Sequence, residues 1–214
     1  MKYKCITGGP ISENCYLLID EKTNQAAVVD PGFLNDVLLN EIKKYTVQRI
    51  LLTHGHFDHI WEADRLHEML GVPVCAYETE AAFAADDKQN GSLLMMYESI
   101  TCKVHEAFKD GEMFQIGEVP VTVLHTPGHT AGGVSYITPD AVFTGDTLMG
   151  YSVGRCDLPT GNSAELRESL KQLAALPGNP DILGRHGPVA TLDDAKPRHP
   201  HFYRKLYGFL YYRH

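Results

Sequence analysis

The segment Thr53-His-Gly-His-Phe-Asp-His59 places four side chains with metal-ligand chemistry within six residues. Imidazole nitrogens and carboxylate oxygens are the ligands that Zn²⁺ and related divalent cations prefer. A lone histidine is most often a satisfied core or surface residue, but four such groups directly after the apolar run Arg49–Leu52 are not explained in that way. The segment therefore predicts a metal centre. Its candidate ligands are His54, His56, Asp58 and His59.

Three further short motifs contain the same kinds of side chain, and each follows an apolar run. They are Thr126-Pro-Gly-His-Thr130, Thr144-Gly-Asp-Thr147 and Gly184-Arg-His-Gly-Pro188, with the candidate ligands His129, Asp146 and His186. One short motif is a weak signal, but together they predict loops at one rim of a rigid sheet, where functional residues are expected. The other histidines lack such a context and are not predicted as ligands. They are His67, His105, His125, His199, His201 and His214.

The elements that must position these loops follow from the alternation of short apolar runs and helical patterns. Runs bounded by turn residues predict strands at 15–19, 26–29, 49–52, 73–76, 113–116, 119–124, 134–137, 141–143 and 181–183. Helical spacing predicts helices at 35–44, 61–70, 163–176 and 201–212. Asn162 and Glu165 resemble a capping box at the start of the third helix. Two similar halves of strands and helices predict an α/β fold with sheets covered by helices.

Composition restricts the class of function. Nineteen Lys and Arg against 27 Asp and Glu give a formal net charge of −8, which argues against a nucleic-acid binder. No run approaches the roughly 18 apolar residues of a membrane span, and no secretory leader is evident. Five scattered cysteines without a CxxC pair favour a reducing compartment. We therefore expect a cytoplasmic enzyme that acts on a small molecule without nucleic acid or membrane, and the oligomeric state stays open.

The order HxHxDH, His, Asp, His resembles the signature of the metallo-β-lactamase fold, and Val29-Asp-Pro-Gly32 fits the first motif of that family. The resemblance runs from about residue 10 to residue 188. It implies an αββα sandwich of two mixed β-sheets flanked by helices, with residues 1–214 as a single hydrolase domain. Residues 145–149 and 154–159 resemble the compact bacterial branch of the glyoxalase II-type hydrolases (hydroxyacylglutathione hydrolases). The helical C-terminal extension of full-length glyoxalase II is expected to be lacking.

The resemblance also implies how two divalent metal ions would be held. His54, His56 and His129 would bind the first ion, and a second set of three residues would bind the other. That second set is Asp58, His59 and His186. Asp146 would bridge the ions, and Asp58 and Asp146 are the predicted catalytic residues. Zinc is the default from the ligand types, although iron and manganese also suit such a site. Asp30 is a candidate for orienting a histidine ligand, or else a turn residue.

The implied reaction is hydrolysis of a thioester, S-2-hydroxyacylglutathione or similar, by attack of a hydroxide that bridges the metals. Without the helical extension, it stays open whether the chain recognises glutathione. The basic residues that could instead bind the substrate carboxylates are Arg155, Arg185, Lys196 and Arg198. The alternatives are a mononuclear non-haem iron persulfide dioxygenase and a hydrolase of another ester, lactone or phosphodiester. Lactam cleavage is disfavoured because Asp146 supplies a bridging carboxylate. A non-catalytic metal-stabilised scaffold would not require the full ligand set.

Overall fold

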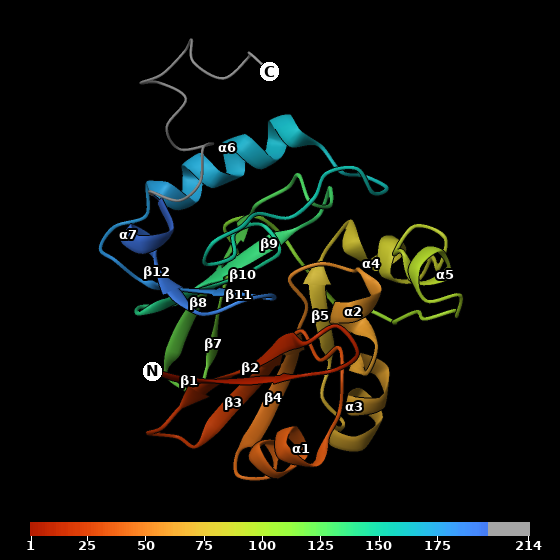
Figure 1. The fold of residues 1–214 in the computed structure, drawn as a ribbon. Helices are drawn as coiled ribbons and strands as arrows, with labels where there is room; N and C mark the ends of the chain where they lie inside the picture. The colour runs from red at the N-terminus through yellow and green to blue at the C-terminus, as the bar shows by residue number, and fades with distance from the viewer. Residues whose placement is uncertain (197–214) are drawn as a thin grey trace.

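The computed structural model of this chain describes residues 1–196 and folds them into two β-sheets with helices on the outer faces (Figure 1). The first sheet contains β1 Lys2–Gly8, β2 Glu13–Asp20, β3 Gln25–Val29, β4 Thr46–Leu51, β5 Val74–Tyr77 and β6 Glu106–Phe108, in the order β1-β2-β3-β4-β5-β6. The second contains β7 Met113–Ile116, β8 Val119–His125, β9 Val134–Ile137, β10 Ala141–Gly145, β11 Asp181–Gly184 and β12 Ala190–Thr191, in the order β12-β11-β10-β9-β8-β7.

Both sheets are mixed, and the parallel pairs explain where the helices lie. In the first sheet β1, β2 and β3 pair antiparallel, whereas β3, β4, β5 and β6 run parallel. In the second sheet only the β10–β11 pair is parallel. Parallel neighbours need a crossover connection. The crossovers contain α1 Asp36–Ile42, α2 Phe57–Ile60, α3 Ala63–Leu70, α4 Glu80–Ala84, α5 Ser92–Met95 and α6 Ser163–Ala174, whereas α7 Leu192–Ala195 directly follows β12.

Three apolar clusters define the layers of the molecule. The alternation of side chains along β2 sends Tyr16 and Leu18 into one cluster and Leu17 and Ile19 into another. The Tyr16 and Leu18 cluster also contains residues of the second sheet, such as Phe143, and therefore lies between the two sheets. The other two clusters join the first sheet to α1 and α3, and the second sheet to α6 and α7. The layers are thus helix, sheet, sheet and helix, and the predicted αββα sandwich is confirmed.

The helix ends agree with their predicted signals. The side chain of Asn162 accepts hydrogen bonds from the backbone N–H groups of Ala164 and Glu165, which caps α6 as expected. The helix ends at Ala174, two residues before the predicted end at Leu176. Gly71 follows α3 with a φ of +69°, a conformation that glycine adopts without strain. Local capping chemistry therefore fixes these boundaries.

Several short elements were not predicted. They are β1, β6, β12, α2, α4, α5 and α7. The predicted helix 61–70 begins at Ala63. The predicted helix 201–212 lies outside the described residues. Within residues 1–196, every helix is too short or too polar to cross a bilayer.

Candidate metal centre

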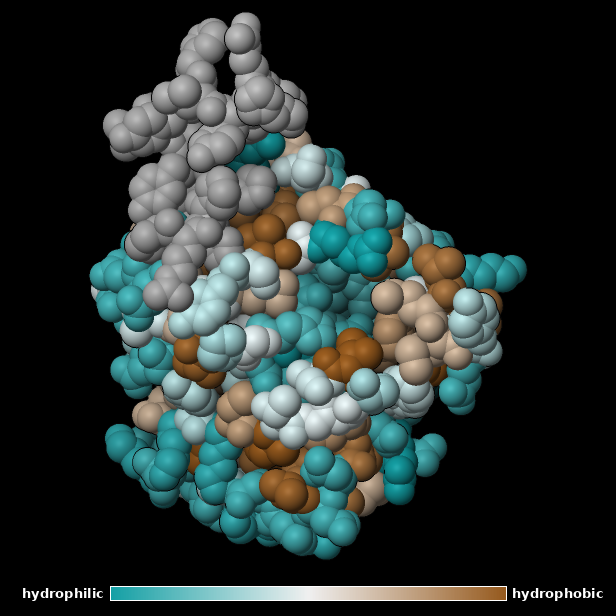
Figure 2. All heavy atoms as spheres, viewed as in Figure 1, coloured by the Kyte–Doolittle hydropathy of each residue, from teal (hydrophilic) through white to brown (hydrophobic). Residues whose placement is uncertain are grey.

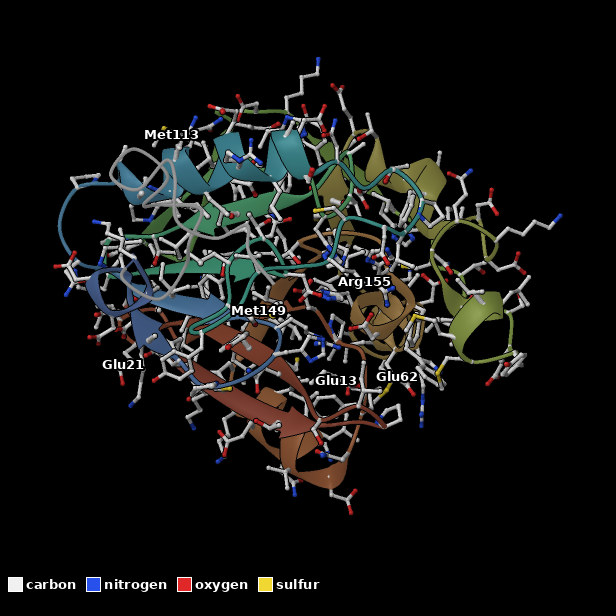
Figure 3. All side chains as sticks on the ribbon, turned by 45° about the horizontal axis from the view of Figure 1, so that its top comes forward. Glu13, Glu21, Glu62, Met113, Met149 and Arg155 are labelled. Atoms are coloured by element: carbon white, nitrogen blue, oxygen red, sulfur yellow. The ribbon has the colours of Figure 1, made fainter. Side chains whose placement is uncertain are left out.

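All seven predicted ligands lie in loops or short helices at one edge of the two sheets. His54 and His56 follow β4, and Asp58 and His59 lie on α2. The loops after β8, β10 and β11 carry the other three, which are His129, Asp146 and His186. In Figure 3 the labelled Met149 and Arg155, from the loop after β10, lie beside this edge. The loops that follow these strands of the two sheets therefore lie together at one edge of the sandwich.

Three imidazole nitrogens converge in a first group. His56 Nδ1 lies 2.9 Å from His54 Nε2 and 2.9 Å from His129 Nε2. All three side chains are buried. Their ligand atoms lie within 4.8 Å of one another, which is close enough to surround a single ion. This group has the same members as the first predicted set.

A second group of ligand atoms lies next to the first. Asp58 Oδ2 lies 3.5 Å from His59 Nε2 and 3.4 Å from His186 Nε2. Asp146 faces both groups, because its Oδ1 lies 3.7 Å from His59 Nε2 and its Oδ2 lies 3.5 Å from His129 Nε2. One carboxylate thus presents one oxygen to each group.

Two atoms that face this centre have no hydrogen-bond partner among the described residues. They are His59 Nε2 and Asp146 Oδ1, and both are buried. A buried polar atom without a partner is costly, and a metal ion supplies the missing interaction. The histidine and aspartate cluster therefore fits divalent metal ions.

Hydrogen bonds behind the ligands fix the orientation of two imidazole rings. His59 Nδ1 lies 3.0 Å from Asp30 Oδ2, and His129 Nδ1 donates to the backbone oxygen of Arg155 at 2.7 Å. With the proton on Nδ1, each ring presents the lone pair of Nε2 to the centre. Asp30 also accepts from the backbone N–H and the hydroxyl of Thr53, at 2.7 and 2.8 Å. The predicted orienting residue thus contacts a ligand, and its φ of +52° marks a strained backbone.

Burial and neighbouring charges set the protonation states that metal binding requires. Burial, together with the neighbouring imidazoles, lowers the pKa of His54 well below its ordinary value and that of His56 to about 3. Burial opposes ionisation of Asp58, but His59 and a hydrogen bond from His186 hold its pKa well below the ordinary range. His54 and His56 are therefore neutral and Asp58 is charged, which are the forms that bind a cation.

A buried carboxylate that was not predicted joins two of the ligand loops. Glu80, at the start of α4, is only 2% exposed. Its Oε2 accepts from the backbone N–H of Gly55 at 2.6 Å, and its Oε1 accepts from that of Gly132 at 2.9 Å. No short motif surrounds Glu80 in the sequence, so only the fold reveals this contact.

Arg185, one of the four candidates for binding a substrate carboxylate, is excluded by its position. Its side chain is 1% exposed and donates hydrogen bonds to the backbone oxygens of Asn14, Asp30 and Asp58. Because these bonds hold the guanidinium inside the protein, it does not reach a substrate. Lys196 directly follows α7 and forms an ion pair with Asp193. Arg198 lies outside the described residues.

Relatives in sequence and structure agree with this geometry. Residues 8–183 match the metallo-β-lactamase superfamily. The probable metallo-hydrolase YqgX of Bacillus subtilis (strain 168) is 38% identical over 207 residues, which span 92% of this chain and 97% of that protein. The hydroxyacylglutathione hydrolase GloC of Haemophilus influenzae is 29% identical over 208 residues, which span 94% and 97% of the two chains.

Three solved structures share the fold. The B3 metallo-β-lactamase BLEG-1 superposes with a TM-score of 0.88 at 31% identity, over 94% of this chain and 99% of that chain. TTHA1623 in a di-iron-bound form gives a TM-score of 0.78 at 31% identity, over 92% and 98%. ETHE1 from Myxococcus xanthus gives 0.76 at 28% identity, over 94% and 84%. The chain therefore belongs to the metallo-β-lactamase superfamily and is one of its metallo-hydrolases.

Proposed function

We propose that this chain is a thioester hydrolase with two divalent metal ions, acting on S-2-hydroxyacylglutathione or a related thioester. His54, His56 and His129 would hold the first ion. The second would be held by Asp58, His59 and His186, with Asp146 between them. The observation that carries the proposal is the position of Asp146, whose two carboxylate oxygens face the two groups. A carboxylate in this position suits a pair of ions better than one.

When bound, the ions would lower the pKa of a shared water and polarise the carbonyl of the substrate. The chain itself orients the reaction. Asp58 lines the pocket, so its carboxylate is placed to hold the attacking water by a hydrogen bond. The thiolate that leaves a thioester has a pKa near 8.5 as the free thiol, so it departs without a dedicated proton donor. This chemistry requires no nucleophilic side chain.

The names of two similar proteins support the proposal. GloC is called a hydroxyacylglutathione hydrolase, and TTHA1623 binds two iron ions. Iron is therefore a second candidate beside zinc for the resident metal. We also propose that residues 1–214 act as one domain on a small molecule in the cytoplasm, without nucleic acid or membrane.

The main alternative is a persulfide dioxygenase with a single iron, and ETHE1 is similar in fold. The second group of ligand atoms around Asp58 favours two ions instead. The B3 lactamase BLEG-1 makes lactam cleavage a further activity to measure.

Elemental analysis of protein purified without added metal, together with turnover of S-lactoylglutathione, tests the proposal. Two ions per chain with hydrolysis of the thioester would support it. One iron per chain with oxygen uptake on glutathione persulfide, and no hydrolysis, would replace it with the dioxygenase. Hydrolysis of a chromogenic cephalosporin without thioester hydrolysis would replace it with a lactamase.

A further inference from the structure

The pocket beside the metal centre has apolar walls. It has a volume of about 200 Å³ and includes five of the proposed ligands in its lining. Apart from these ligands, Gly154 and Arg155, the wall is formed by six apolar side chains. They are Ile11, Phe57, Met95, Met149, Val153 and Leu158. The walls therefore offer apolar contacts to whatever flanks the reacting carbonyl.

The apolar surface continues from the floor of the pocket to its rim. Phe57 and Met149 are buried, whereas Met95 on α5 is 47% exposed and marks the rim. Leu94, directly before Met95, and Tyr97, two residues after it, are also exposed. Figure 2 shows the hollow in this face with hydrophobic side chains gathered on the α4 and α5 side. A substrate that enters here passes over apolar atoms.

Outside the proposed metal ligands, the pocket wall carries little charge. Among the pocket-lining residues within 1–196, Arg155 is the only lysine or arginine. Its Nε and Nη2 donate to the two carboxylate oxygens of Asp157, at 2.6 and 2.8 Å, so the pair is close to neutral. A glutathione moiety carries two carboxylates and one ammonium group. Removing such charges from water without partners is unfavourable, and this wall offers few partners.

We propose that the preferred substrate is a small thioester with an uncharged, apolar acyl group on a thiol without charged groups. This inference rests on the proposed thioester hydrolysis and names its substrate class. The volume of about 200 Å³ lies below the roughly 300–1,000 Å³ of pockets for drug-sized ligands. An acyl group of a few carbons fills such a space, whereas a charged tripeptide gains little from it.

Four thioesters test the substrate class on the metal-loaded enzyme: butanoyl and lactoyl esters, each on N-acetylcysteamine and on glutathione. We expect kcat/KM for butanoyl-N-acetylcysteamine to exceed that for lactoylglutathione by at least about tenfold, since a single methylene in an apolar pocket is worth 10-fold or more. Comparing the butanoyl with the lactoyl ester on the same thiol shows how much of the gain in kcat/KM comes from the acyl group. A value for lactoylglutathione equal to or above that of butanoyl-N-acetylcysteamine overturns the inference.

Failure of the underlying function gives a different result. If none of the four thioesters is hydrolysed by enzyme with its full metal content, thioester hydrolysis itself is wrong. If all four are hydrolysed and the glutathione esters are faster, only the substrate class is wrong.

A pair of variants tests whether the apolar rim causes the selectivity. Met95→Lys places a charge at the rim, and we expect it to lower kcat/KM for butanoyl-N-acetylcysteamine about tenfold and to raise that for lactoylglutathione. Met69→Lys is the control, because Met69 is 51% exposed on α3 and is not part of the pocket lining. Equal selectivity in the two variants contradicts the role of the rim. Thermal unfolding of both variants checks that each is folded.

Discussion

Glu80 accepts a hydrogen bond of 2.6 Å from the backbone N–H of Gly55, the residue between His54 and His56. Its other oxygen accepts from Gly132, three residues after His129. One buried carboxylate thus fixes the backbone of two ligand loops that belong to different sheets. Hydrogen bonds to a charged group contribute about 1.5–3 kcal/mol each, so this link is strong enough to hold the loops in place.

The variant Glu80→Gln tests this link. The glutamine keeps the shape of the side chain but replaces one oxygen by an NH₂ group that faces a backbone N–H. We expect a folded protein whose affinity for Zn²⁺ or Fe²⁺ falls about 10- to 100-fold, as for other residues that position metal ligands. Metal titration measures this effect, and Glu78→Gln, an exposed neighbour, is the control. Unchanged metal affinity in Glu80→Gln would show that the ligand loops do not depend on this carboxylate.

Removal of the carboxylate charge at Asp146 tests the dinuclear centre. Asp146→Asn keeps the volume of the side chain but weakens its interaction with both groups. We expect a loss of about one ion per chain and a fall in kcat on the order of 100-fold. Elemental analysis and thioester turnover measure the two effects, with the exposed Asp140→Asn as control. Full metal content with full turnover would be incompatible with a bridging role.

Asp30→Asn tests how the orientation of His59 affects the metal site. Asparagine tolerates the left-handed backbone at this position, so the variant isolates the change in charge. An amide accepts more weakly than a carboxylate from His59 Nδ1 and from Thr53. We expect metal affinity to fall about 10- to 100-fold with little change in the melting temperature of the metal-free protein. A large drop in that melting temperature with unchanged affinity would instead assign Asp30 to the stability of the fold.

The buried imidazoles predict how stability depends on pH. His54 and His56 stay neutral in the folded metal-free chain, whereas the unfolded chain binds protons at these residues below their ordinary pKa of 6.5. The unfolded state therefore binds more protons between pH 6.5 and about 3, and the free energy of unfolding falls as the pH falls through this window. Each imidazole contributes up to about 1.4 kcal/mol per pH unit.

Chemical denaturation of chelator-treated protein at pH 6.5 and pH 5 measures this dependence. His59 has a raised pKa, so its own contribution changes above pH 6.5 rather than within the window. His56→Asn removes one of the two buried imidazoles. We expect the free energy of unfolding of this variant to change less with pH than that of the unchanged chain. Identical slopes for the two proteins would mean that His56 binds a proton in the folded state.

Much of the fold, and the gathering of the candidate ligands at one edge, could be predicted from the sequence because both depend on local patterns. The HxHxDH segment is contiguous, and each remaining ligand follows an apolar strand within a few residues. The αββα layers follow from the alternation of strands such as β2, whose Leu17 and Leu18 face opposite sides. Periodicity alone predicts sheets covered by helices, whereas the αββα order and the two ligand sets are implied by the resemblance to the metallo-β-lactamase fold.

The roles of Glu80 and Arg185 could not be predicted, because each depends on contacts between distant segments. Glu80 contacts a residue 52 positions later in the chain. Arg185 donates to a backbone oxygen 171 positions earlier. A charged side chain usually lies at the surface, so sequence alone favours exposure for both. Only the packing of the two sheets shows that these residues are buried.

The proposed ligands come from both sheets, with four after β4 and three after β8, β10 and β11. Bound ions would therefore join two halves of the chain that also meet through apolar contacts and through the hydrogen bonds of Glu80 and Arg185. An ion that binds only the folded chain stabilises it by mass action, in proportion to the logarithm of its free concentration. The supply of metal in the cell would then set the lifetime of this protein as well as its activity, and starvation for metal would expose it to proteolysis.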